Sequence, residues 1–132
     1  MVRVFKTRQF DKWMRKTLLT DEALCDAVSE MRRGLVDADL GGGLFKKRAA
    51  LPGRGKRAGA RLLVVSNRRD RWIFIGGFKK KERDNLQPDD LRTSRLLAAT
   101  LLGMTLPEPK SPSVTDALME ICHERTQKAD PS

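Results

Sequence analysis

The sequence predicts an α+β domain with a small, mostly antiparallel four-stranded sheet, two N-terminal helices and a C-terminal helix. Three observations lead to this prediction. The chain has 132 residues, which is the length of one domain. Leu, Ile, Val and Phe supply 32 of them, enough to form a hydrophobic core. The apolar pattern follows the order strand, two helices, three strands and helix, which is typical of helices packed on one sheet.

The N-terminal third contains the first strand and both N-terminal helices. Val2–Phe5 is a short strand candidate, and Thr7 can cap the helix that follows. Four side chains of that helix share one face at helical spacing: Phe10, Trp13, Met14 and Thr17. A second helix begins at Thr20, with acidic residues in its first turn and Gly34 after its last. Its predicted apolar face consists of Leu24, Val28, Met31 and Leu35.

Strands follow in the middle of the chain. Gly41–Gly43 interrupts the helical pattern, and we interpret it as a helix-to-strand turn. Leu44–Leu51 is a strand candidate, and Pro52–Gly59 is a loop that is either a mobile cationic arm or a solvated turn. Ala60–Ser66 and Arg71–Phe78 are the next strands. Because short turns join these strands, we expect antiparallel pairing.

The last helix begins at Pro88, a residue suited to the first helical position, and ends near Gly103. We therefore divide the chain into a domain at 1–102 and a proline-containing extension at 103–132. Three apolar residues of the extension keep helical spacing: Val114, Leu118 and Ile121. Such a stripe favours docking on the domain over the alternative, a frayed terminus.

The cysteine pattern and the hydropathy exclude several classes of protein. Cys25 and Cys122 form no disulfide framework and lack metal-ligand spacing; in a docked extension Cys122 is expected to be a buried free thiol. No apolar run has the length of a membrane span, and the N-terminus is charged too early for a secretory signal. We expect a cytoplasmic domain that needs neither cofactor nor metal.

The positive charge is concentrated in the middle of the chain. The net charge is +10, and residues 44–83 contain 14 basic and 2 acidic side chains. Such a field attracts polyanions, and nucleic acid is the obvious partner. The alternative is a merely solvated face, although solvated faces usually mix both signs. The charge lies on strands and loops, unlike that of proteins that insert a helix into the DNA groove.

The side chains available for catalysis are few. The chain has no Tyr and one His, His123, which makes a serine-type triad improbable. Cleavage of RNA by its own 2′-hydroxyl can nevertheless proceed on a Lys- and Arg-rich surface, which orients the phosphate and stabilises its developing charge. A Lys crowded by other cations loses affinity for its proton and becomes a better base. The same surface is equally suited to passive RNA binding.

Two long motifs resemble toxins of the RelE/ParE superfamily, in its HigB-like branch. One is residues 40–61, LGGGLFKKRAALPGRGKRAGAR. The other is residues 70–85, DRWIFIGGFKKKERDN, which contains the branch's Gly-Phe-x-Lys-x-Glu-Arg-x-Asn signature. The resemblance covers roughly residues 3–102, and residues 120–123 look like a short ending common in the branch.

This resemblance implies a type II toxin that enters the ribosomal A site, cleaves mRNA and is restrained by a co-encoded antitoxin, a small DNA-binding protein. It also implies a microbial-ribonuclease-like sheet with these candidate catalytic residues: Arg61, Lys80, Lys47 and Lys46. The candidate RNA-binding residues are Arg48, Arg54, Lys56, Arg57, Arg68, Lys79 and Arg83. Arg61 and Lys80 occupy strand ends, where we do not expect a charge in the core. Lys46 and Lys47 are adjacent on a strand, so only one of them can line the site.

The sequence departs from the superfamily pattern in one respect that bears on catalysis. Several members place a C-terminal Tyr or His near the reacting phosphate, whereas this chain has only His123, which the extension would have to deliver. Relatives in the ParE branch poison DNA gyrase, so the fold alone does not determine the activity. The alternatives are a gyrase-directed toxin and a non-catalytic RNA- or ribosome-binding module.

Overall fold

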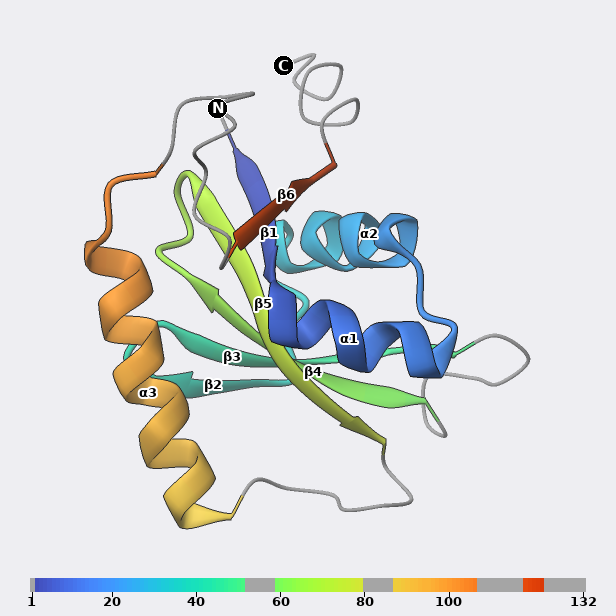
Figure 1. Cartoon of the computed structure of the whole chain (residues 1–132). Helices are drawn as coiled ribbons and strands as arrows, with labels where there is room; N and C mark the ends of the chain where they lie inside the picture. Colours follow the sequence, from blue (N-terminus) through green and yellow to red (C-terminus); the bar gives the residue numbers. More distant parts are fainter. Residues whose placement is uncertain (1, 52–58, 80–86, 107–117, 123–132) are drawn as a thin grey trace.

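A computed structural model describes residues 2–51, 59–79, 87–106 and 118–122, and these residues form three helices and one six-stranded sheet (Figure 1). The elements in chain order are β1 (Arg3–Thr7), α1 (Arg8–Thr17), α2 (Asp21–Arg32), β2 (Ala38–Gly41), β3 (Leu44–Ala49), β4 (Ala60–Ser66), β5 (Arg71–Lys79), α3 (Pro88–Gly103) and β6 (Leu118–Ile121).

The sheet is larger than predicted and is mixed. Its strand order is β2-β3-β4-β5-β1-β6. The β3–β4–β5 ladder is antiparallel as expected, but β1 pairs with β5 in parallel. The prediction of four strands is wrong because it missed two edge strands of four residues each, β2 and β6. Such short strands show little alternation, and their partners are chosen by the rest of the fold.

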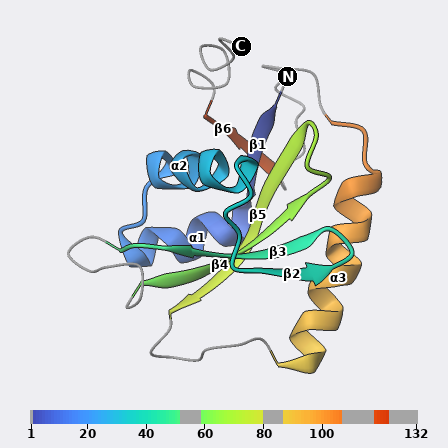
Figure 2. The same cartoon turned by 180° about the vertical axis from the view of Figure 1, so that it is seen from behind.

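The glycine run lies at the tip of the β2–β3 hairpin, seen from behind in Figure 2. Gly41, Gly42 and Gly43 have φ angles of +88°, +65° and +84°, which other residues rarely adopt. A Cβ on Gly43 would lie 2.5 Å from Leu102 Cδ1 of α3, so the hairpin tip also packs tightly on that helix. The expectation of a helix-to-strand turn is therefore wrong, because the chain has already entered β2.

The N-terminal helices begin where the capping residues predict. The Thr7 side-chain oxygen accepts a hydrogen bond from the Phe10 amide at 3.0 Å, and Thr20 accepts one from Ala23 at 3.1 Å. The expectation that Leu35 extends the apolar face of α2 is wrong. The helix ends at Arg32, Gly34 turns the chain with a φ of +92°, and Leu35 is 54% exposed.

Each face of the sheet has its own core. The cluster beside α1 and α2 is built on buried side chains that include Met14, Leu24, Leu62 and Phe74. The cluster beside α3 includes Leu63, Val65, Ile73 and Leu101. Every residue of β4 is buried, because β4 lies between two strands and contributes alternate side chains to both cores.

Two arginines hold α3 in place. The Arg71 guanidinium donates to the Leu101 and Met104 carbonyls at 3.1 and 2.7 Å, which satisfies acceptors at the helix C-terminus. The Arg95 Nε donates to the Leu40 carbonyl of β2 at 2.7 Å. Part of the positive charge of the chain is thus structural.

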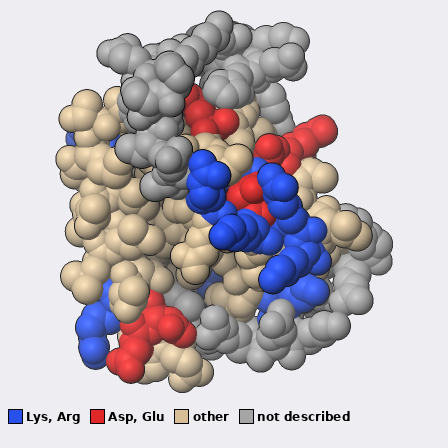
Figure 3. Space-filling view, viewed as in Figure 1, with Lys and Arg blue, Asp and Glu red and all other residues tan. Residues whose placement is uncertain are grey.

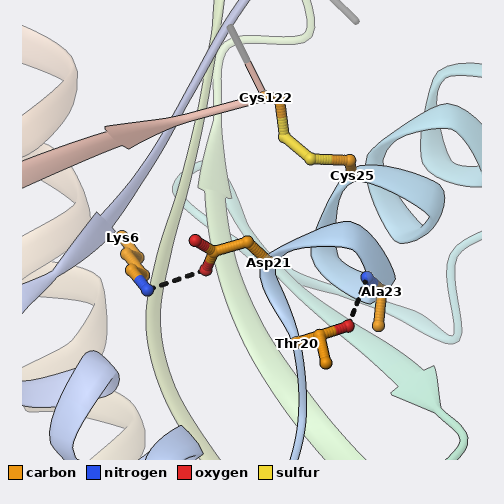
Figure 4. Close-up of a disulfide and its surroundings, with 6 residues drawn as sticks. All are labelled: Lys6, Thr20, Asp21, Ala23, Cys25 and Cys122. Carbon is orange, nitrogen blue, oxygen red and sulfur yellow. Dashed lines mark hydrogen bonds and ion pairs between the residues drawn. A yellow bond between two sulfur atoms is a disulfide. The ribbon is translucent and has the colours of Figure 1, made fainter. Parts of the chain in front are cut away.

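A buried lysine joins β1 to the two helices that follow it. Lys6 is 5% exposed, and its Nζ lies 2.6 Å from Asp11 Oδ1 of α1. It also lies 2.7 Å from Asp21 Oδ1 of α2, the contact drawn in Figure 4. Burial by itself lowers the pKa of Lys6, but hydrogen bonds and attraction from both carboxylates outweigh it, so the pKa is raised. The hydrogen bond from Lys6 holds the pKa of Asp11 below its usual value.

The described end of the chain is tied to the domain by a strand and a disulfide. β6 pairs antiparallel with β1, and Arg3 donates to Glu120 at 2.7 and 3.0 Å. Leu118 and Ile121 are buried in different cores, because residues three apart in a strand point to opposite faces. The expectation that they share one apolar stripe at helical spacing is therefore wrong, although this part of the extension does dock on the domain.

Cys122 bonds to Cys25 of α2, so the expectation of a free thiol is wrong (Figure 4). The two cysteines are 97 positions apart in the sequence, and only the placement of β6 beside β1 brings them together. Their sequence spacing carries no signal of this pairing.

We predict that Asp11→Asn lowers the free energy of unfolding by about 1.5–3 kcal/mol at pH 7, because a buried charged hydrogen bond is lost. The lowered pKa means that Asp11 stabilises the fold above the carboxyl pKa of the unfolded chain, about 3.9, and loses this contribution as the pH falls further. Urea unfolding from pH 7 down to pH 2.5 should show the wild type and the variant converging in acid. A constant difference would contradict the assignment.

We also predict that Cys25→Ser and Cys122→Ser each lower the free energy of unfolding of the oxidised protein by about 2–4 kcal/mol, because the crosslink restricts the unfolded chain. The double variant should lose no more than either single one. Denaturant unfolding in a reducing buffer is the control, since wild type and variants should then agree closely. Equal stability without reductant would show that the crosslink does not stabilise the fold.

Candidate nucleic-acid interface

The register of β3 and β4 gathers three basic residues on one face of the sheet. Arg48 lies directly opposite Arg61, and Lys46 lies opposite Leu63. Because side chains alternate along a strand, Lys46, Arg48 and Arg61 share the face to which Leu63 and α3 belong. We call these three residues the basic sheet face.

The members of the basic sheet face differ in exposure. Arg61 is only 5% exposed, so the expectation that a strand-end charge lies outside the core is wrong here. It follows the first residue of the central strand, where Arg48 flanks it on β3 and Phe78 on β5. Arg48 is half-exposed and forms an ion pair with Asp37 at 3.0 Å. Lys46 is half-buried. Arg48 and Arg61 are thus opposed in the ladder, and two guanidinium groups on opposed positions are suited to binding one phosphate.

Lys47 points to the other face. It is buried, its Nζ lies 2.7 Å from Glu30 Oε1 of α2, and it donates to the Leu35 carbonyl at 2.8 Å. The sequence left open which of the two adjacent lysines lines the site. The geometry joins Lys46 to Arg48 and Arg61, and gives Lys47 a contact that holds α2 on the sheet.

The other predicted RNA-binding residues are spread over the fold. Arg68 lies in the turn between β4 and β5, at the far end of β4 from Arg61, with its guanidinium 4.6 Å from the centre of the Phe45 ring. Lys79 ends β5 opposite Ala60, the residue before Arg61. Lys79 therefore shares the face of Ala60, which is the face opposite to that of Arg61. Five candidates lie outside the described residues: Arg54, Lys56, Arg57, Lys80 and Arg83.

A second basic surface lies on α1 and was missed by the sequence analysis. Its exposed side chains are Arg8, Lys12, Arg15 and Lys16, and Figure 3 shows blue side chains gathered over this helix. Arg15 also bonds Asp11 at 2.9 Å. The signal was present as basic residues at helical spacing. It was hidden because residues 1–43 contain nearly as many acidic as basic side chains.

The described residues offer little that could serve as a proton shuttle. Lys6 has a raised pKa and is held by two carboxylates, which makes it a poor base at neutral pH. Within the described ranges, no cluster of His, Cys, Asp and Glu could hold a metal ion. His123 lies outside those ranges. The chemistry of this surface is therefore that of fixed positive charge on a rigid sheet.

The family model for the RelE toxin of RelE/RelB toxin–antitoxin systems matches residues 2–121. The chain belongs to the RelE toxin family. A search of the curated proteins returns no match.

The family match confirms the resemblance to RelE-type toxins and extends it. It covers every described strand and helix, including β6, which lies beyond the 3–102 range of the sequence motifs. The basic sheet face and the basic surface of α1 both lie inside this RelE match. Among the described residues, no helix is both long and apolar enough to cross a membrane.

We predict that alanine substitutions at the two adjacent lysines affect different properties, toxicity for Lys46 and stability for Lys47. Lys46→Ala should reduce toxicity on induction in bacteria and leave thermal stability nearly unchanged, because Lys46 is half-buried on the basic sheet face. Lys47→Ala should lower stability by about 3 kcal/mol or more, because Glu30 loses its buried partner. Growth assays and thermal unfolding of both variants test this pair. A stable but non-toxic Lys47→Ala protein would reverse the assignment of faces.

Proposed function

We propose that this RelE-family chain is a type II toxin of the HigB-like branch that inhibits translation by cleaving mRNA at the ribosomal A site. The observation that carries the proposal is the family match over residues 2–121, within which lies the opposed pair Arg48 and Arg61. A rigid pair of guanidinium groups on a sheet suits the recognition of one phosphate of a flexible RNA strand.

The proposed reaction uses a nucleophile supplied by the substrate. The 2′-oxygen of the ribose forms a bond to the adjacent phosphorus, and the bond from phosphorus to the 5′-oxygen breaks. The 2′-hydroxyl gives up its proton, and the 5′-oxygen receives one. The products are a 2′,3′-cyclic phosphate and a 5′-hydroxyl. The protein needs neither a metal nor a covalent intermediate for these steps.

In this proposal Arg61 and Arg48 bind the non-bridging oxygens, and Lys46 adds a third positive charge on the same face. They stand on strands held in a fixed register, and charges placed in advance stabilise the developing charge with little reorganisation. Lys80, which follows β5 in the sequence, is proposed as a further catalytic residue. The remaining proton transfers involve groups of the ribosome, solvent or the C-terminal extension that carries His123.

The proposed partner is a cognate antitoxin encoded by the adjacent gene, a small DNA-binding protein with an acidic segment. That segment either fills the basic sheet face or binds elsewhere and blocks entry to the ribosome. Residues 44–83 contain 14 basic and 2 acidic side chains, so association should be fast and sensitive to salt.

Two other functions remain alternatives. One is a gyrase-directed toxin, because relatives in the ParE branch act on that enzyme. The other is a basic RNA- or ribosome-binding module without catalysis. Pulse-labelling after induction separates all three. Cleavage predicts that methionine incorporation falls before thymidine incorporation and that mRNA is cut. A gyrase toxin stops thymidine incorporation first, and a passive binder stops translation while mRNA remains intact.

We predict that Arg61→Ala lowers the rate of RNA cleavage by at least about 100-fold and abolishes toxicity. This is the scale expected when one preorganised charge that stabilises a transition state is lost. Because Arg61 is buried, Arg61→Lys is the second variant: it keeps a charge but loses the planar fork, and should be partly active. Arg92→Ala, an exposed arginine on α3, is the matched control and should stay toxic.

Circular dichroism and thermal unfolding establish that the Arg61 variants are folded. A folded Arg61→Ala protein that cleaves RNA as fast as the wild type would remove Arg61 from the proposed site.

A further inference from the structure

A cavity of about 330 Å³ opens beside β5, between α1 and α3. β1 pairs only with Arg71–Phe74, so the last part of β5 runs beyond the end of β1. In Figure 1 this part of β5 has α1 on one side and α3 on the other. The cavity is lined by all three elements and by Leu63 of the neighbouring β4.

Two consecutive glycines of β5 give the cavity its shape. A Cβ on Gly76 would approach only Leu63 Cδ1, at 3.5 Å, so the missing side chain leaves open space in the floor. A Cβ on Gly77 would lie 2.6 Å from two ring atoms of Trp13. The indole therefore rests directly on the strand backbone and forms a flat wall. The two glycines of the Gly-Gly-Phe segment are thus needed to form this cavity. The basic sheet face alone would not explain why glycine occupies these positions.

We propose that this cavity binds one nucleobase of the RNA, a role that rests on the proposed function above. Its lining includes two aromatic side chains, Trp13 against the Gly77 face of β5 and Phe78 on the other face. It also has the polar side chains of Gln9, Thr93 and Ser94 and the carboxylate of Asp90. Proteins that bind single-stranded RNA stack bases on aromatic side chains and hydrogen-bond their edges with such groups.

The cavity also adjoins the groups proposed to hold the phosphate. Phe78 lines the cavity and is the register partner of Arg61 on the adjacent strand. One nucleotide can therefore place its base in the cavity and an adjoining phosphate at Arg61. On the other side, Gln9 and Trp13 belong to α1, whose exposed face is basic. The basic residues on both sides outnumber the one carboxylate of the described lining, Asp90, and favour a nucleotide over an uncharged peptide segment.

The test compares nucleotides with a sugar phosphate that has no base. The four ribonucleoside 5′-monophosphates and ribose 5-phosphate are titrated into the full-length protein, and the Trp13 indole N–H signal is followed by NMR. At least one nucleotide should bind about tenfold or more tightly than ribose 5-phosphate, as expected for one base stacked on an aromatic ring. Equal binding of nucleotides and ribose 5-phosphate would overturn the proposal.

Gly76→Val is the decisive variant, because it fills the cavity at a position with room for a side chain. It should remove the preference for nucleotides over ribose 5-phosphate. Gly103→Val is the matched control, since that exposed glycine at the end of α3 has nothing within 4 Å of its Cβ position. Ser94→Phe, which fills the cavity from α3, gives a second variant in case Gly76→Val does not fold.

Unchanged nucleotide preference in a folded cavity-filling variant would overturn the proposal. The proposal would also be overturned if a cavity-filling variant kept its preference for nucleotides and lost only its binding of an acidic antitoxin peptide. The result is separable from the proposed function. Base-dependent binding by a protein that does not cleave RNA would refute cleavage alone, and cleavage unaffected by a filled cavity would refute the base site alone.

Discussion

The pairing of β4 with β3 and β5 is the constraint on which both candidate sites depend. β4 has a strand on each edge and a core on each face, and all of its residues are buried. A shift of β4 by one residue would turn Arg61 to the face that Leu62 now occupies. It would also turn every apolar side chain of β4 away from the core that it now fills. The same register that fills the two cores therefore sets Arg61 opposite Arg48 on one side and Phe78 on the other.

The position of α1 depends on a different set of contacts. Lys6 connects β1 to α1 and α2 through two carboxylates, and the Cys25–Cys122 disulfide connects α2 to the end of β6. Because β1 stops at Thr7 and α1 begins at the next residue, the helix lies beside the part of β5 that β1 does not cover. Trp13 then reaches Gly77, which forms one wall of the cavity. A structural ion pair and a backbone glycine thus determine where an RNA base could bind.

Local features of the fold were predictable from the sequence, and features set by distant contacts were not. Thr7 and Thr20 fix helix starts through hydrogen bonds to amides three residues on, and Pro88 fixes one through its restricted φ angle. The antiparallel β3–β4–β5 ladder followed from short connections and from apolar runs. The parallel β1–β5 pair, β6 and the disulfide depend on residues that are about 70 to 120 positions apart, for which periodicity has no signal.

The candidate site likewise has features that the local sequence predicted and features that depend on distant contacts. The concentration of charge in residues 44–83 indicated the basic strands, and alternation along a strand predicted that Lys46 and Lys47 point apart. Which of them joins Arg61 depends on where α2 packs, and Glu30 decides it. The burial of Arg61 follows from the central place of β4, which a single sequence does not reveal.

The central claim is that the basic sheet face promotes attack by the RNA's own 2′-hydroxyl. Analysis of the ends of mRNA fragments from ribosomes incubated with the purified protein tests it most directly. The account predicts fragments with a 2′,3′-cyclic phosphate on one side of the cut and a 5′-hydroxyl on the other. Intact mRNA, or fragments with 5′-phosphate ends, would contradict it.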